Sequence, residues 1–512
     1  MIEKTSTPQS KKIIRNVFIA VFLVTLSVTG CVNHEMKKFR GTFSEKAYID
    51  DIQPLKGTYI IKNVHVLSED GASMRNNQQV LISGHQIEAI APIIKAPAEQ
   101  VVDGGGMFLI PGLMDGHVHI SENPNNLLLN LANGVTHIRD MGGNAYHLNL
   151  KKEEATFPLR PMLFTTTEKV YSCGGIKAWF IEWTRTRICM GSVKEAEKIV
   201  SEAKADGFDA LKVGNGLEAE HYWALLKAAK SADLGVTGHI PSTITLEQFL
   251  ESGQYESAHV EEFTKVMIRE FGWINAETEG EFIEHVKRRS FEIAPIIQKK
   301  GMAVTSVIWL MESLPQQKFN LEGFLKTIEL EYMDPAKVEG TRLARGWLPG
   351  HHSYAVDDAV MNDPERRKLS EIFWRNYVKA IHIMTKALID EHVILMAGTD
   401  AITTGAVPGF ALHDELESLV KVGMSPAQSL QSATRVPGKW LGNKTGQMKN
   451  GYKANLVLLR KNPLTDIRHT RSIESVIING QLLNRQQLDT ILERIRMANN
   501  ETRTIDISDY QK

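Results

Sequence analysis

Two histidines spaced two residues apart carry the clearest chemical signal in this sequence. His117 and His119 end an apolar segment, within Gly116-His117-Val118-His119. If the segment is a β-strand, both imidazoles point to one face, because side chains two positions apart share a face of a strand. Imidazole is a common ligand of zinc and similar ions. The pair therefore suggests part of a metal site, although His-x-His pairs also occur in ordinary buried strands.

Further candidate ligands lie in or at the ends of other predicted strands. Each has a plain structural explanation when taken alone, since a lone buried histidine is usually a hydrogen-bonded core residue and a lone strand lysine usually extends to solvent. Histidine, lysine and aspartate converging from five strands are much harder to explain in that way. We therefore predict one metal site from His117, His119, Lys212, His239, His259 and Asp400.

The elements that position these residues alternate between strands and helices, and this alternation predicts parallel strands. The eight candidate strands are 113–120, 135–141, 162–170, 210–213, 235–240, 256–260, 303–309 and 393–399. Eight units favour an α/β fold of the closed (β/α)8, TIM-like barrel type. An open doubly wound sheet would need a Gly-rich phosphate turn after its first strand, and none is present. In such barrels the chemistry lies at the C-terminal ends of the strands, where the candidate ligands occur.

Helix starts and turns within this pattern carry local signals. Ser192 with Glu195, and Ser425 followed by proline with Gln428, have the spacing of helix capping boxes. The connection over 311–366 is longer than one crossover needs, which predicts a lid or a substrate loop. Within it, His351, His352 and Tyr354 are expected mainly as exposed polar loop residues, with contact to substrate as the alternative.

Short strand-like segments occur at both ends of the chain. They cover 59–66, 79–82 and 86–90, and then 455–459 and 473–483. The last one contains Asn479-Gly480, the pair favoured in type I′ hairpins. We predict a small β-sandwich domain formed by 56–110 and 444–485, a barrel over 111–443, and a polar tail over 486–512.

The N-terminus has the features of an export signal. Basic residues precede an uncharged apolar run over 17–30, which is too short to span a bilayer, since a spanning helix needs about 20 residues. Small residues before Cys31 resemble the lipobox of bacterial lipoproteins. The resemblance implies a signal peptide over 1–30, lipidation of Cys31, a tether over 31–55 and a membrane-anchored protein of the cell envelope that faces the periplasm or the exterior. An uncleaved N-terminal anchor is the alternative.

The charge and the cysteine content of the sequence limit which partners and which disulfide bonds can be expected. The formal net charge is −1, so nothing electrostatic favours a nucleic acid as partner. After Cys31 only Cys173 and Cys189 remain, without a Cys-x-x-Cys motif. A disulfide between them is possible in an oxidising compartment, but we expect two unpaired cysteines.

The candidate ligands and their flanking sequences resemble the amidohydrolase superfamily, in particular its imidazolonepropionase-like and prolidase-like branch. The resemblance covers about residues 58–483. It rests on Pro111-Gly112-Leu113-Met114-Asp115-Gly116, Gly134-Val135-Thr136-His137-Ile138-Arg139-Asp140, Gly398-Thr399-Asp400-Ala401, Leu412-His413-Asp414-Glu415-Leu416, Ala433-Thr434, Asn462-Pro463-Leu464 and Val476-Ile477-Ile478-Asn479-Gly480.

The resemblance implies a binuclear metal hydrolase with two divalent ions, expected to be Zn²⁺. His117, His119 and Asp400 would surround one ion, and His239 and His259 the other. Lys212 would carry CO2 as a carbamate and bridge the ions together with a hydroxide. Asp400 would act as the catalytic residue that transfers a proton from the hydroxide to the leaving group.

The sequence departs from the family pattern at two places. Asn455 stands where aspartate is common, and it is expected to lie in the sandwich, far from the metals. Gly174-Gly175-Ile176 stands where many relatives have Gly-Gly-His, which weakens any transfer of substrate identity. Arg139 and Asp140 follow the second strand and are candidates either for binding a substrate carboxylate or for a structural ion pair.

Three functions remain open at this point. The first is hydrolysis of an amide-like C–N bond in a small molecule, of the dipeptide or N-acyl amino acid type. The second is hydrolysis of a lactone or another ester at the same site, because the fold does not choose between them. The third is a non-catalytic barrel that acts as a binding protein. A mononuclear deaminase or imidazolonase fits less well, because those relatives lack the bridging lysine.

Overall fold

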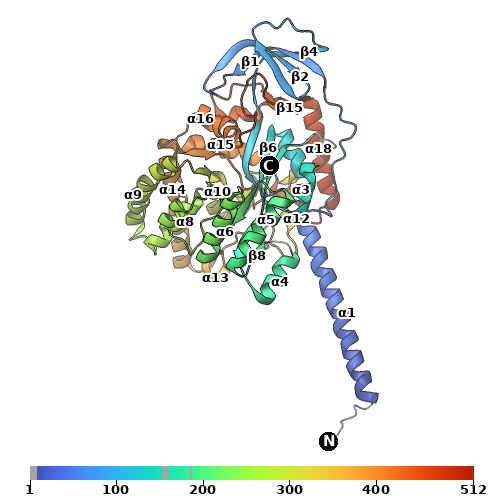
Figure 1. The fold of residues 1–512 in the computed structure, drawn as a ribbon, viewed down its shortest axis with the longest axis vertical. Coiled ribbons are helices and arrows are strands. Elements are labelled where there is room, and N and C mark those ends of the chain that lie inside the picture. Colours follow the sequence, from blue (N-terminus) through green and yellow to red (C-terminus); the bar gives the residue numbers. More distant parts are fainter. Residues whose placement is uncertain (1–7, 153–158, 185–186, 512) are drawn as a thin grey trace.

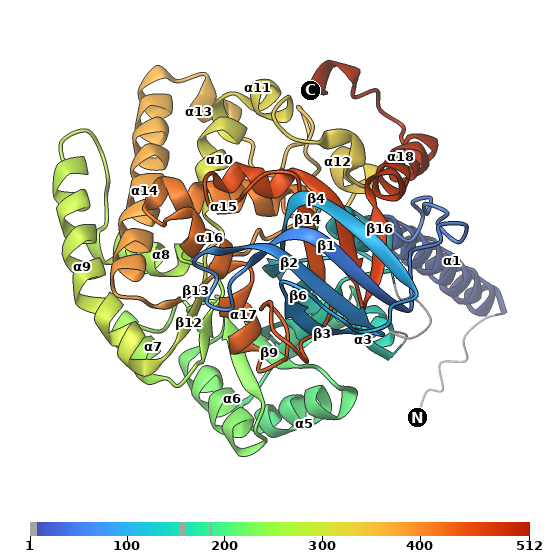
Figure 2. The ribbon, with the colours of Figure 1, turned by 90° about the horizontal axis from the view of Figure 1, so that it is seen from above.

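A computed structural model of the chain describes residues 8–152, 159–184 and 187–511. A mixed β-sheet lies at one end of the molecule, next to a larger body in which helices surround short strands (Figure 1). The view from above shows these helices arranged around the strands (Figure 2). A long N-terminal helix, α1 (Pro8–Phe39), projects from the body on the side away from the sheet (Figure 1).

Both ends of the chain contribute to the mixed sheet, as the sequence predicts. Its seven strands are hydrogen-bonded in the order β16-β15-β14-β4-β1-β2-β3. Their bounds are β1 Thr58–Leu67, β2 Met74–Ser83, β3 Gln86–Ala91, β4 Gln100–Pro111, β14 Leu456–Leu459, β15 Ile473–Ile478 and β16 Gln481–Asn484. Asn479 and Gly480 join the last two strands with φ of 49° and 73°. Both residues are in the left-handed region that a type I′ turn requires, so the predicted hairpin is confirmed.

Parallel strands form the centre of the larger body. One sheet has the order β10-β9-β7-β6-β5, with β8 also paired to β7, and a second has the order β11-β12-β13. The bounds are β5 Leu113–Val118, β6 Val135–Gly143, β7 Met162–Ser172, β8 Ile188–Met190, β9 Ala210–Val213, β10 Gly235–Gly238, β11 Glu256–Ser257, β12 Ala303–Thr305 and β13 Ile394–Met396. All eight predicted strands are present, and most are shorter than predicted because the ladder hydrogen bonds end before the predicted C-terminal residues of these strands.

Hydrogen bonds also join the two parallel sheets at their edges. On one side the Ala258 amide donates to the Gly238 carbonyl over 2.9 Å, next to β10 and β11. On the other side the Gly116 amide of β5 donates to the Ala397 carbonyl over 2.8 Å, just after β13. Gly116 permits this approach, because a Cβ there would lie 2.7 Å from the Ala397 oxygen. The segment that carries Asp400 therefore lies directly beside the segment that carries the first two histidines.

Helices cover the outer face of these strands. They include α5 Ala196–Asp206, α6 Ala219–Ser231, α7 Leu246–Glu251, α8 Glu261–Phe271, α9 Glu279–Lys300, α14 Pro364–Asp390, α15 Phe410–Val422, α16 Pro426–Ser432 and α17 Arg435–Trp440. Ser425 and Gln428 form the predicted capping box at the start of α16. The capping box predicted at Ser192 is wrong. The Ser192 hydroxyl donates to the Glu195 carboxylate over 3.2 Å, and a 3₁₀ turn precedes α5.

The segment predicted as a lid or substrate loop, 311–366, is largely helical. It contains most of α10 (Ile308–Phe319), then α11 (Leu321–Leu325), α12 (Pro335–Glu339) and α13 (Asp358–Met361). Residues of this segment form a hydrophobic cluster with two residues that follow Asp400; the cluster includes Phe324, Leu325, Trp347, Leu348, Ile402 and Val407. The segment is thus packed against the strand end that carries Asp400.

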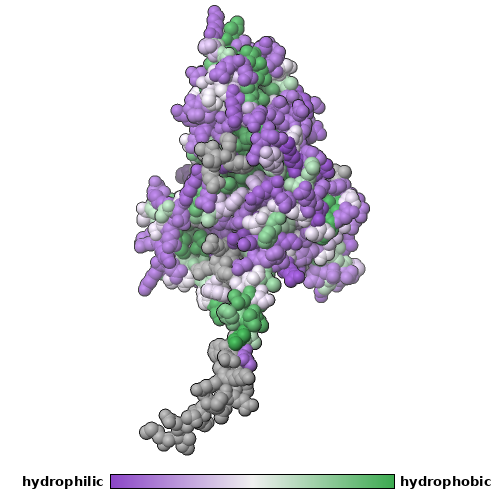
Figure 3. Space-filling model, turned by 90° about the vertical axis from the view of Figure 1, so that its right-hand side faces the viewer, coloured by the Kyte–Doolittle hydropathy of each residue, from purple (hydrophilic) through white to green (hydrophobic). Residues whose placement is uncertain are grey.

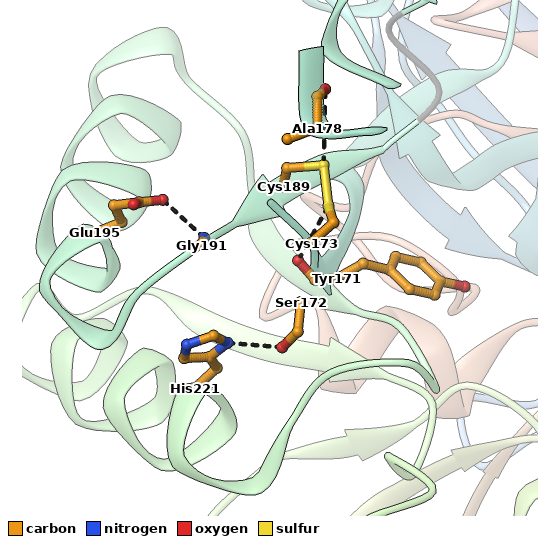
Figure 4. Close-up of a disulfide and its surroundings, with 8 residues drawn as sticks. All are labelled: Tyr171, Ser172, Cys173, Ala178, Cys189, Gly191, Glu195 and His221. Carbon is orange, nitrogen blue, oxygen red and sulfur yellow. Dashed lines mark hydrogen bonds between the residues drawn. A yellow bond between two sulfur atoms is a disulfide. The ribbon is translucent and has the colours of Figure 1, made fainter. Parts of the chain in front are cut away.

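The cysteine expectation is wrong, because Cys173 and Cys189 form a disulfide. Strand β8 pairs in parallel with the end of β7, and Tyr171 lies opposite Cys189. This pairing brings the two cysteine Cα atoms to 5.2 Å, within disulfide range. Figure 4 shows the bond closing the base of the excursion that carries α4 (Gly175–Thr184). The pairing of β7 with β8 carries no local sequence signal, which is why the sequence left it open.

The N-terminal region has two parts. Helix α1 exposes apolar side chains, among them Phe22, Leu23 and Val24, and Figure 3 shows hydrophobic residues where it leaves the body. Cys31 is exposed and unpaired on this helix. No helix in the described part of the chain is long and apolar enough to cross a membrane.

Residues 40–55, within the predicted tether, pack on the body of the molecule. The Ala47 amide donates to Asn125 over 2.9 Å, and Ile49 and Ile52 are buried. A flexible tether would therefore have to lie before this segment. At the other end, the predicted polar tail contains α18 (Arg485–Thr502), whose apolar side chains Leu488, Ile491 and Ile495 are buried.

Candidate metal centre

The structure brings the six predicted ligands together at one end of the parallel strands. His117 Nε2 and His119 Nε2 lie 3.4 and 3.2 Å from the same carboxylate oxygen, Oδ1 of Asp400. Asp400 has φ of 56° and is held by its amide, which donates to the His117 carbonyl over 2.8 Å. These three side chains form one group whose ligand atoms lie within 4.8 Å of one another.

Lys212 lies at the centre of this arrangement and is fully buried. Its Nζ is 3.3 Å from His117 Nε2 and 3.4 Å from His119 Nε2. Burial, followed by the positive charge of Lys169, lowers the pKa of Lys212 well below its usual value. A lysine in this environment is favoured as the neutral amine, which is the form that reacts with CO2.

The second pair of histidines forms a neighbouring group. His259 Nε2 lies 3.5 Å from His117 Nε2 and 3.9 Å from Asp400 Oδ2, which links the two groups. His239 Nδ1 lies 2.9 Å from Glu262, and this hydrogen bond leaves the Nε2 atom of His239 for another partner. His239, His259 and Glu262 again have ligand atoms within 4.8 Å of one another.

Glu262 was missed by the sequence analysis, and it orients the second group. It is buried at the start of α8, where it accepts hydrogen bonds from His239, from the Ile240 amide and from Lys265. Burial acts to raise its pKa, but the hydrogen bond from His239 and the charge of Lys265 hold that pKa well below the usual range. Its position three residues after His259 was the only signal in the sequence, and such a spacing is common in helices without any function.

A second layer of hydrogen bonds holds the first group. The Asp115 carboxylate accepts a hydrogen bond from Thr399 Oγ1 over 2.7 Å and others from the Thr399 and His117 amides. Burial raises the pKa of Asp115 to about 7. His117 Nδ1 faces the Ala258 carbonyl at 3.2 Å, so its Nε2 is directed into the site. These contacts orient imidazoles in the way that outer-shell partners orient metal ligands.

The donor set fits divalent cations. Asp400 Oδ1 is buried and has no hydrogen-bond partner within the described chain, and Nε2 of His259 faces the same carboxylate. Burial lowers the pKa of both His119 and His239 to about 4, so their imidazoles are neutral at pH 7 and offer lone pairs. Neutral imidazoles and a carboxylate whose lone pairs point to one position are the ligands that zinc-like ions prefer.

Arg139 and Asp140 are placed in structural contacts. Both oxygens of Glu256 accept hydrogen bonds from the Arg139 guanidinium, over 2.9 and 2.7 Å, and the guanidinium lies 4.4 Å from the Trp440 ring centre. Asp140 accepts from the Ile120 amide over 2.8 Å. Of the two roles considered for Arg139, the structure supports the structural ion pair.

Lys169 and Tyr354 are two further residues near the site, and the sequence analysis did not single out the first. Burial lowers the pKa of Lys169, and the carboxylates of Asp400 and Glu262 oppose this shift. Burial raises the pKa of Tyr354, and Asp400 is among the charges that act on it. The expectation of exposed loop residues holds for His351 but is wrong for His352, which is 2% exposed because 311–366 packs as a compact unit.

Comparison with known proteins places this geometry in a family. The model of the amidohydrolase family matches residues 108–483, which include all six predicted ligands. The chain belongs to the amidohydrolase family. Within it, a dihydroorotase of Bacillus pumilus is 37% identical over 65 residues, 13% of this chain and only 15% of that enzyme.

Solved structures of amidohydrolases share the fold. A bottromycin amidohydrolase superposes with a TM-score of 0.64 at 19% identity, over 86% of this chain and 90% of its own. A Xaa-Pro dipeptidase with methionine bound in its active site gives a TM-score of 0.57 at 17% identity, over 84% of this chain and its full length, 100%. At these identities the similarity establishes the common fold and leaves the substrate open.

Proposed function

We propose that this protein is a metal-dependent hydrolase that cleaves an amide-like C–N bond in a small molecule of the dipeptide or N-acyl amino acid type. We also propose that two divalent ions, expected to be Zn²⁺, are held by His117, His119, Lys212, His239, His259 and Asp400. The observation that supports this most directly is the buried Asp400 Oδ1, which faces two neutral imidazoles and has no hydrogen-bond partner within the described chain.

The residues of the chain have distinct parts in this reaction. Bound divalent ions lower the pKa of water towards about 7 and polarise a carbonyl group. Although burial opposes it, the neighbouring side chains of His119, His259 and Lys212 hold the pKa of Asp400 well below its usual range. Asp400 is therefore ionised and can accept a proton from the attacking water and deliver it to the leaving amine. Such general acid–base transfer contributes roughly 10²–10⁴-fold to a rate.

Lys212 would act as the bridging ligand after reaction of its amine with CO2. An ammonium group at this buried position, 3.3 and 3.4 Å from two imidazoles, would repel the metal ions. A carbamate replaces that positive charge with a carboxylate of the kind that binds two cations. The full burial of Lys212 supports this assignment, because an ordinary strand lysine extends to solvent.

Two proposals concern the architecture: the parallel strands form a closed barrel, and the mixed sheet belongs to a separate small domain. The hydrogen bonds Ala258 to Gly238 and Gly116 to Ala397 support a closed (β/α)8 barrel that includes both parallel sheets. The mixed sheet built from both chain ends would then be the small β-sandwich domain that accompanies the barrel. Closure would place all the strand ends around one mouth, which is the location of the chemistry in such barrels.

We also propose that the protein is a membrane-anchored lipoprotein of the cell envelope, with a signal over 1–30 and lipidation at Cys31. The exposed Cys31 and the exposed apolar side chains of α1 support this proposal. The disulfide between Cys173 and Cys189 is consistent with an oxidising compartment.

Metal content is the first test of this proposal. The form beginning at Val32, purified without chelator and with bicarbonate present, is expected to contain about two divalent ions per chain. One ion would indicate a mononuclear hydrolase with Lys212 as an ordinary strand residue. None, even after reconstitution with zinc, would favour the non-catalytic barrel.

A substrate panel of dipeptides, N-acyl amino acids and lactones tests the reaction itself. Asp400→Asn is expected to lower kcat/KM by roughly 10²–10⁴-fold on every substrate that the parent cleaves. Turnover of lactones alone would establish the esterase alternative. An Asp400→Asn variant that matches the parent on all substrates would show that the proposed site is wrong.

A further inference from the structure

Three cationic residues lie in one row at the mouth of the metal centre, two on neighbouring strands and the third just before strand β8. Lys212 of β9 is directly opposite Lys169 of β7 in the parallel register. On the other edge of β7, Val170 lies opposite Ile188 and Tyr171 opposite Cys189. One position further back along both strands, Lys169 therefore lies beside Arg187. Residues opposite one another in a sheet project to the same face, so this row faces the site into which Lys212 points.

The contacts of these side chains agree with this placement. Tyr171 lies two positions after Lys169 and therefore shares its face of β7. The Arg187 guanidinium lies 4.4 Å from the centre of the Tyr171 ring. The Tyr171 ring points away from the Ser172–His221 pair on the other side of the strand (Figure 4). Asp400, Glu262 and Arg187 are among the charges that act on the pKa of Lys169, which agrees with its position opposite Lys212.

Lys169 and Arg187 differ from the other cations near the site, because the described residues give them no anionic partner. Within the described chain, neither makes a hydrogen bond or an ion pair with a carboxylate. By contrast, Lys265 bonds to both Glu261 and Glu262, and Arg139 bonds to Glu256. Two like charges held side by side next to a cation centre are unfavourable unless an anion joins them. The disulfide fastens the end of β7, the strand that carries Lys169, to β8, which begins one residue after Arg187.

We infer that Lys169 and Arg187 form a binding site for the carboxylate of the substrate, so that the enzyme selects acyl compounds with a free carboxylate over neutral amides and lactones. The inference rests on the proposed hydrolase function and specifies its substrate class. An arginine offers a planar pair of donors and a lysine a compact charge, and together they match a carboxylate. Such charge-assisted contacts typically change affinity by roughly 10- to 100-fold.

The binding test uses two probes that differ in the carboxylate alone, 3-phenylpropionate and 3-phenylpropanol. Calorimetry on the chelator-treated full-length chain excludes coordination of the probe to metal. We expect the carboxylate to bind at least roughly 10-fold more tightly than the alcohol in the parent. The preference should persist in the matched control Lys194→Gln, an exposed lysine outside the site. The preference for the carboxylate over the alcohol should be lost in Lys169→Gln and reduced in Arg187→Gln.

The activity test compares kcat/KM for N-acetyl amino acids with that for the corresponding amides, in the enzyme as purified. Lys169→Gln and Arg187→Gln should lower kcat/KM for the carboxylates by roughly 10- to 100-fold and leave the amides nearly unchanged. Hydrolysis without any carboxylate preference would overturn this inference and leave the proposed function intact. A carboxylate preference in binding without hydrolysis of any acyl compound would overturn the proposed function and support the site.

Discussion

Two clusters of charged and polar residues lie among the parallel strands, and they are completed in different ways. In the first, each carboxylate oxygen of Glu256 accepts two hydrogen bonds, from Arg139 and from Thr305 or Thr237. In the second, His117, His119 and Lys212 surround Asp400, whose Oδ1 has no hydrogen-bond partner in the described chain. Both clusters are buried. The carboxylate of the first has all its partners within the described chain, although Arg139 Nε has none, and the carboxylate of the second keeps one oxygen without a partner.

This difference separates a structural cluster from a binding site. Burial of polar groups costs free energy unless their hydrogen bonds are formed, so a folded protein normally pairs them. The Glu256 carboxylate follows that rule, and it engages both terminal nitrogens of Arg139. The Asp400 cluster departs from it at Oδ1 of Asp400, the atom on which the two imidazoles converge, which is expected where a ligand completes the coordination.

The largest effect on stability is expected in the satisfied cluster. Arg139→Met leaves the Glu256 carboxylate buried without its counter-charge, which should lower the free energy of unfolding by about 3–5 kcal/mol. The measurement is urea unfolding at pH 7 in the presence of chelator. The double variant Arg139→Met/Glu256→Leu should recover much of the loss. Equal stability of Arg139→Met and the parent would remove the distinction between the two clusters.

A smaller effect should come from pH, and of the two clusters only the metal-site cluster should contribute to it. Burial lowers the pKa of His119 and His239 from 6.5 to about 4. The unfolded chain therefore binds more protons between these values, and the metal-free protein should lose stability as the pH falls from about 7 to 5. The pKa of Glu256 is lowered from 4.5, so its cluster contributes fully throughout this range.

Urea unfolding of the chelator-treated protein at pH 7, 6 and 5 measures this dependence. The variant His119→Gln/His239→Gln should show a flatter dependence on pH than the parent. An unchanged slope in this variant would mean that other groups cause the acid sensitivity.

The smallest effect on stability is expected for Lys212→Met, although this substitution should abolish metal binding at the proposed centre. Among described residues, the amine of Lys212 contacts two imidazoles and bonds to no carboxylate, so replacing it with an apolar side chain of similar length removes a buried polar group. The free energy of unfolding of the metal-free protein should stay the same or rise by about 1 kcal/mol. Metal analysis should show fewer ions per chain. A loss as large as that for Arg139→Met would show that Lys212 is structural.

Features that depend on neighbouring residues were predicted correctly from the sequence, whereas features that depend on strand pairing were missed. The strands over 113–118 and 210–213 were predictable because apolar and β-branched residues cluster there, and the Asn479-Gly480 turn was predictable because its backbone suits few other residues. The pairing of β7 with β8 was missed, since β8 has only three residues. The disulfide and the position of Arg187 were missed for the same reason.

The sequence by itself determined which side chains have metal-binding chemistry and that they lie in or at the ends of successive strands, because residue type and spacing are local properties. Only the tertiary structure decided which of them meet. It brought Glu262 to His239, paired Arg139 with Glu256, and placed Lys169 beside Arg187. These contacts join residues far apart in the chain or on different strands. They depend on how the strands pair and how the helices pack, and no local pattern records that arrangement.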